Sequence, residues 1–107
     1  MEEMLTPNFS ISIMGKIELS ASQLLEIYSI AESVKKSIDC EEAVTYKWDI
    51  VVVASPLLRK YLNKISQISL NVKVDFITIE GNKKFLLLHQ LISDKNSNIY
   101  RVYLLEF

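Results

Sequence analysis

The side chains that most often carry catalysis or bind metal ions are scarce in this sequence. Its 107 residues include one histidine, His89, and one cysteine, Cys40. A structural zinc site needs four such ligands, and a catalytic triad needs a nucleophile motif in addition to its histidine. His89 lies between Leu88 and Gln90 in an apolar predicted strand, which favours a structural or surface role. We therefore predict that the protein is not an enzyme and has no metal site and no cofactor. An enzyme built from scattered carboxylates is the least favoured alternative.

Basic side chains offer a different chemistry, the binding of phosphate groups. They lie near the end of the first predicted strand, at the start of the second predicted helix and on the terminal hairpin, where Tyr100 or Tyr103 could stack on bases. Lysines on exposed hairpins also serve solubility and protect sheet edges, and this alternative stays open. The candidate nucleic-acid contacts are Lys16, Arg59, Lys60, Lys83, Lys84 and Lys95.

Overall charge limits what these basic residues can do. Twelve basic and thirteen acidic residues give a formal net charge of −1. A protein that packages nucleic acid is normally clearly basic, so attraction to phosphate would have to come from a local patch. With one cysteine no intramolecular disulfide can form. The acidic start has no apolar core typical of a signal peptide, and no run is long enough to span a membrane. We predict a cytoplasmic protein that does not enter the membrane.

Length and composition predict one folded domain over residues 1–107, with residues 1–7 flexible. Half of the residues are apolar, close to the average of globular proteins. Only two glycines and two prolines occur, which favours long regular elements joined by short connections.

Two helices are predicted from apolar residues spaced three and four apart. Ser20 and Gln23 have the spacing of a capping box, and the apolar stripe behind them predicts a helix over 21–38. Ser55, followed by proline, is typical of a helix N-cap, and a second stripe runs from there to Ile68.

Two strands are predicted in the first half of the chain. Residues 9–14 alternate apolar and polar side chains, with a possible bend at Gly15. Residues 43–54 also have strand character, and the run 50–53 is apolar throughout. Such a run is typical of a central strand that is covered on both faces, often a parallel one.

The second half of the chain predicts a long hairpin. One strand begins near residue 70 and continues to 92, with a bulge or tight bend at 80–82. A polar turn at 93–98 leads to a final strand over 99–107. The predicted fold class is α/β, in detail an α+β two-layer sandwich of order βαβαββ, in which two helices pack on one mixed four-stranded sheet.

Apolar side chains occur on both faces of the predicted hairpin. If both helices cover one face, the other stays exposed unless a partner covers it. A self-complementary dimer is the simplest cover. The predicted dimer interface comprises Leu57, Tyr61, Leu87, Tyr103 and Leu105.

Several stretches resemble the Alba family, small archaeal proteins that bind DNA and RNA and share a fold with the C-terminal domain of bacterial initiation factor three. Residues 12–16, Ser-Ile-Met-Gly-Lys, resemble the end of the family's first strand, and residues 49–54 resemble its second. Residues 74–80, 93–98 and 100–105 resemble its hairpin arm. The resemblance implies a dimer that holds nucleic acid across its second helices and between its hairpin arms.

The same comparison implies that Lys16 is a phosphate contact, but the family's next lysine falls at Ile17 here. Ser55-Pro56-Leu57 replaces a basic turn. We therefore predict a homodimer, or a heterodimer with a more basic relative, that binds DNA or RNA weakly and without sequence specificity. The alternative is a protein–protein assembly module on the same fold that has lost nucleic-acid binding.

Overall fold

The computed structural model describes residues 9–37, 46–68, 73–93 and 98–107. The predictions for residues 1–7, for Lys95 and for most of the turn at 93–98 lie outside these residues.

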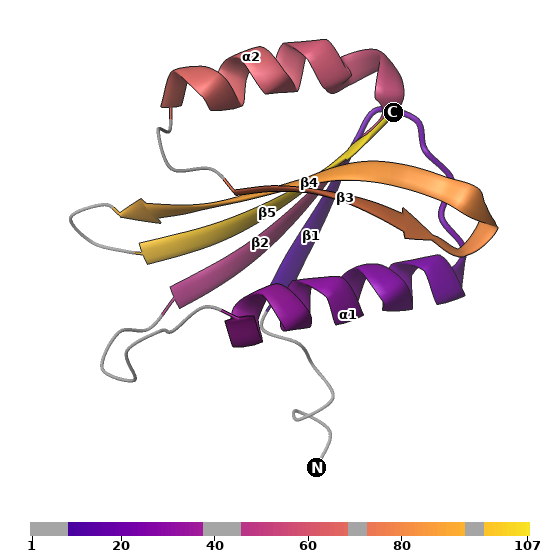
Figure 1. The fold of residues 1–107 in the computed structure, drawn as a ribbon, viewed down its shortest axis with the longest axis horizontal. Helices are drawn as coiled ribbons and strands as arrows, with labels where there is room; N and C mark the ends of the chain where they lie inside the picture. Colours follow the sequence, from indigo (N-terminus) through magenta and orange to yellow (C-terminus); the bar gives the residue numbers. More distant parts are fainter. Residues whose placement is uncertain (1–8, 38–45, 69–72, 94–97) are drawn as a thin grey trace.

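Two α-helices and five strands form the described fold (Figure 1). Short 3-10 turns at Ser55–Leu57 and Glu80–Asn82 precede α2 and β4. The elements in chain order are β1 (Phe9–Met14), α1 (Ala21–Ser37), β2 (Tyr46–Val53), α2 (Leu58–Ile68), β3 (Lys73–Ile79), β4 (Lys83–Ser93) and β5 (Asn98–Glu106).

All five strands belong to one mixed sheet with the order β1-β2-β5-β4-β3. β1, β2 and β5 run parallel to one another, whereas β4 is antiparallel to both β5 and β3. The α+β class, the single mixed sheet and the order βαβα of the first four elements are confirmed. β2 is indeed a parallel strand with neighbours on both sides.

The sheet has five strands and not the predicted four, because the expected long strand folds back on itself. Gly81 adopts a φ of 79° and Asn82 a φ of 59°, a left-handed conformation that suits a tight turn. β3 and β4 therefore pair as a hairpin in which Ile79 lies opposite Lys83. The bend predicted at 80–82 is present, and it is sharp enough to reverse the chain.

The helices cover opposite faces of the sheet, which corrects the predicted two-layer arrangement (Figure 1). Side chains alternate between faces along a strand, so Ile50 and Val52 of β2 pack with α1, while Val51 and Val53 pack with α2. The apolar run of β2 thus has a helix on each side of it.

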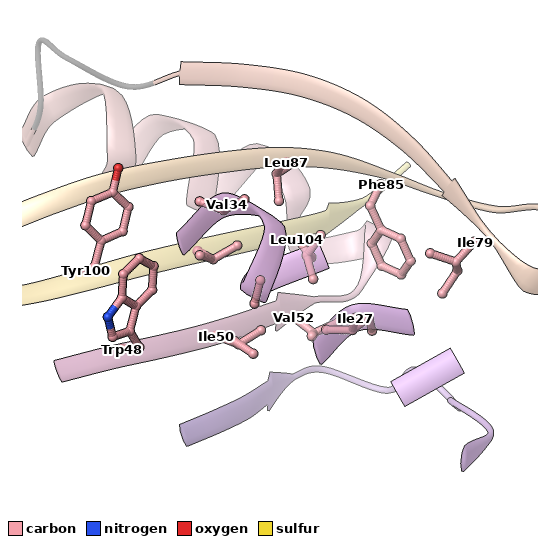
Figure 2. Packing of buried hydrophobic residues seen from close by; sticks show 12 residues of the cluster. Ile27, Val34, Trp48, Ile50, Val52, Ile79, Phe85, Leu87, Tyr100 and Leu104 are labelled. Atoms are coloured by element: carbon pink, nitrogen blue, oxygen red, sulfur yellow. The ribbon is translucent and has the colours of Figure 1, made fainter. Parts of the chain in front are cut away.

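The larger core lies between α1 and the sheet. Ile27 and Ala31 of α1 are fully buried, and they pack with Phe85 and Leu104 from neighbouring strands (Figure 2). The smaller core lies under α2, where Ile65 packs with side chains of β2, β4 and β5. Both cores are built from one chain.

The start of α1 is fixed by the predicted capping box. The Ser20 hydroxyl accepts a hydrogen bond from the Gln23 N–H at 3.1 Å, and the Gln23 side-chain oxygen accepts one from the Ser20 N–H at 2.8 Å. The start of α2 differs from the prediction, because the Ser55 hydroxyl is not its cap. The Ser55 N–H instead donates to the Glu106 carboxylate at 3.0 Å.

Candidate nucleic-acid interface

Five of the six predicted nucleic-acid contacts lie at one end of the sheet. β1, β2 and β5 are parallel, so their carboxyl ends coincide, and β4 starts at that same end because it runs the opposite way. Lys16 follows β1, Arg59 and Lys60 open α2 just beyond β2, and a lysine pair opens β4. We call this group the basic end, which comprises Lys16, Arg59, Lys60, Lys83 and Lys84.

The loop after β1 is anchored to the start of α2. The Ala54 N–H donates to the Met14 carbonyl at 2.9 Å. Gly15 has a φ of +88°, and a Cβ added to it would lie 2.9 Å from the Ala54 Cβ and 3.1 Å from Leu57. Only glycine fits this approach, which keeps Lys16 beside the helix that carries Arg59.

Glu106 joins α2 to β4 at the basic end. One of its carboxylate oxygens accepts the Ser55 N–H, and the other lies 3.6 Å from the Lys83 ammonium. Lys83 is therefore the one member of the basic end with a described ion pair. Lys16, Arg59, Lys60 and Lys84 are exposed to solvent.

Two exposed aromatic rings lie beside these lysines and were not predicted as contacts. Phe76 of β3 is 74% exposed and Phe107, directly after β5, is 53% exposed. Their ring centres lie 5.7 Å apart in an edge-to-face arrangement. The Phe107 N–H donates to the Lys84 carbonyl at 3.2 Å. The sequence signal for Phe76 is that Phe76 and Ile77 are consecutive apolar residues of a strand, so their side chains lie on opposite faces of the sheet.

Tyr100 and Tyr103, the predicted stacking partners, are buried and cannot reach a base as they lie. Tyr100 packs in the α1 core, where its ring stacks on Trp48 with centres 4.5 Å apart (Figure 2). Tyr103 packs in the core under α2. Each face of the sheet is covered by a helix, so neither tyrosine is accessible.

The same arrangement places the predicted dimer residues inside one chain. Leu87 is buried in the α1 core, and Tyr103 and Leu105 are buried under α2. Leu57 and Tyr61 are partly buried against the same α2 core. Of the predicted set, Leu57 and Tyr61 therefore keep accessible surface that a second copy could contact, whereas the other three are buried in the cores.

A row of polar side chains crosses the α2 face of the sheet, at the end opposite the basic end. Asp49 accepts a hydrogen bond from the Ser10 hydroxyl at 2.6 Å and pairs with the Arg101 guanidinium at 3.2 Å. Gln90 lies next to Arg101 on β4 and is buried. Burial lowers the pKa of Arg101, but hydrogen bonds to Tyr103 and Asp49 outweigh it and raise the pKa. Arg101, a basic residue of the predicted hairpin, is thus engaged in an ion pair within the sheet.

His89 is buried within the sheet, which agrees with the predicted structural role and not with a surface one. Its side chain is 8% exposed, and its Nδ1 shares a 2.8 Å hydrogen bond with the Tyr100 hydroxyl. Burial lowers the pKa of His89, the nearby Lys73 lowers it further, and Asp75 partly opposes both.

We expect acid to destabilise the fold through His89. A histidine whose pKa is lower in the folded state binds protons more tightly when unfolded, so stability is lost as pH falls below about 6.5. Thermal melts between neutral pH and about pH 5 should show a falling midpoint. A His89→Phe variant should show a smaller fall over that range, and an unchanged fall in this variant would contradict the assignment to His89.

Within the described ranges, no group of three or more His, Cys, Asp and Glu side chains lies close enough together to hold a metal ion. The described helices are also too short or too polar to cross a membrane. Comparison of the chain with known proteins gave no matching family model, no matching curated protein and no matching solved structure.

Proposed function

We propose that this chain is a non-enzymatic, cytoplasmic protein that binds DNA or RNA through the basic end, weakly and without sequence specificity. The observation that supports the proposal is the convergence of Lys16, Arg59, Lys60, Lys83 and Lys84. They come from three separate segments of the sequence, and the parallel strands bring these segments to one end of the sheet.

The chemistry of these side chains fits phosphate better than base edges. Lysine and arginine on a strand end and a first helical turn can neutralise a phosphate backbone, which attracts nucleic acid whatever its sequence. The formal net charge of −1 opposes this attraction, so the expected binding is weak and sensitive to salt. The Alba resemblance belongs to the same proposal, with Lys16 as a phosphate contact.

The test is fluorescence anisotropy of purified, nuclease-treated protein with short duplex DNA, duplex RNA and single strands. We expect micromolar affinity at about 50 mM salt that falls steeply towards about 200 mM, because counterions are released on binding. Absence of binding at the lower salt concentration would contradict the proposal.

A second candidate, a protein–protein assembly module, is favoured by one observation. β3 is an edge strand of the described sheet, and its Val74 and Phe76 are exposed. A second copy could pair along this edge to give a homodimer, and a more basic relative could form a heterodimer there. Sedimentation of the nuclease-treated protein decides this, because the mass of a single chain at high concentration would exclude the homodimer.

A further inference from the structure

Phe76 and Phe107 form an exposed aromatic pair on the α2 face of the sheet. Large apolar side chains on an edge strand are usually avoided, because they invite association with other molecules. Here the two rings touch edge to face with centres 5.7 Å apart, yet 74% of Phe76 and 53% of Phe107 stay accessible. Most of the surface of both rings is therefore available to a ligand.

Strand register places this pair against the basic end. Lys84 lies opposite Thr78 on β3, so Phe76, two residues before Thr78, is its diagonal neighbour on the same face. Phe107 lies on the other side of Lys84, where its N–H donates to the Lys84 carbonyl. Both exposed rings thus belong to neighbours of Lys84, Phe76 across the β3–β4 pair and Phe107 through a backbone hydrogen bond.

The first turns of α2 border the same surface. The Ser55 N–H, just before the helix, donates to Glu106, and Glu106 is adjacent to Phe107. Arg59 and Lys60 follow a few residues later and are exposed. Positive charge and accessible aromatic rings therefore lie at the same end of the sheet, and Lys84, Arg59 and Lys60 have no described ion pair.

We propose that this surface binds single-stranded DNA or RNA in preference to duplex, with bases stacked on Phe76 and Phe107 and the backbone held by Lys84, Arg59 and Lys60. This inference rests on the proposed function and specifies its ligand. Unpaired bases stack on aromatic side chains whatever their sequence, while lysine and arginine follow the phosphates. Bases of a duplex are already stacked on one another inside the double helix, so they are not available to stack on Phe76 or Phe107.

The test compares a labelled oligothymidine, a labelled oligouridine and a short duplex in anisotropy titrations with Phe76→Ala and Phe107→Ala. Each variant should weaken single-strand binding by roughly 5- to 150-fold, the range of a lost stacking contact, and change duplex binding less than about twofold. The slope of log affinity against log salt should stay the same, because no charge is removed.

Three controls accompany these variants. Leu25→Ala removes another exposed apolar side chain, which lies on α1 and is 69% accessible. It should change neither the affinity for single strands nor the affinity for duplex. Phe76→Trp keeps a stacking surface and should restore single-strand binding. An oligonucleotide that carries 2-aminopurine should be quenched on binding to the wild type and less quenched by Phe76→Ala.

Three outcomes would overturn the stacking role of Phe76 and Phe107. If the Phe variants bind single strands as the wild type does while Lys84→Glu weakens all ligands, stacking is wrong and phosphate binding stands. If no nucleic acid binds at all, both fall. If Phe76→Ala lowers the sedimentation mass and leaves nucleic-acid affinity unchanged, the rings contact a second copy of the chain, and the stacking role is overturned.

Discussion

Replacing Lys16 and Lys84 together with glutamate is expected to lower nucleic-acid affinity by roughly 10- to 100-fold. Both side chains are exposed, so the change should not disturb the core. The slope of log affinity for duplex DNA against log salt concentration should also become shallower by about 1.8. Each of the two lost phosphate contacts contributes about 0.9 to that slope. Anisotropy titrations over a range of salt concentrations measure both quantities.

The matched control is Lys36→Glu with Lys47→Glu. These lysines are exposed in the last turn of α1 and at the start of β2, away from the basic end. Each substitution replaces +1 with −1, so either pair takes the net charge from −1 to −5. If the control pair weakens binding as much as Lys16 and Lys84 do, overall charge governs binding and the basic end is not the site.

The second large effect concerns the stability of the loop that carries Lys16. Gly15→Ala should lower the free energy of unfolding by about 2–4 kcal/mol, since a left-handed alanine costs about 1–2 kcal/mol and overpacking adds a similar amount. The added methyl would lie 2.9 Å from the Ala54 Cβ, whose backbone is hydrogen-bonded to β1 and cannot easily retreat. Urea denaturation measures the change.

Gly81→Ala separates the backbone and contact contributions. Gly81 also has a positive φ, of +79°, but its nearest neighbour is the flexible end of Gln23 at 3.3 Å. The Gly81→Ala variant should therefore lose only the backbone contribution to the free energy of unfolding, about 1–2 kcal/mol. Equal losses in the two variants would mean that contact with Ala54 does not matter.

Most helices, strands and turns could be predicted from the sequence, because capping residues, apolar spacing and turn residues act on the chain segment that contains them. The capping box of Ser20 and Gln23 forms as its spacing predicts, and α1 ends at Ser37, one residue from the expected end. The turn at Gly81 was also predicted, because glycine and asparagine after an apolar stretch are typical turn residues, and both adopt a positive φ there. What was misjudged there was the angle through which the chain turns.

The position of α2 could not be predicted from its own residues. An amphipathic stripe shows that a helix covers something, but not which face of the sheet it covers. The apolar run 50–53 did carry that information, since Val51 and Val53 need a cover as much as Ile50 does. Because both faces are covered, Leu87, Tyr103 and Leu105 of the predicted dimer interface are buried within the chain.

The basic residues of the candidate site were predicted one by one, but their convergence depends on the sheet. Lys16 and Lys84 are far apart in the sequence and lie at the same end of the sheet because β4 runs antiparallel to β5, which is parallel to β2 and β1. Phe107 was overlooked because only the register of β5 with β4 places it against Lys84.

The most direct measurement of the central claim is a map of amide chemical shifts of the isotopically labelled protein during titration with oligothymidine. We expect the shifts to concentrate at residues 15–16, 55–60 and 83–84 and at Phe107, all at the basic end, and to spare the outer face of α1. Shifts that concentrate on α1, or none under conditions where anisotropy reports binding, would contradict the claim that the basic end binds nucleic acid.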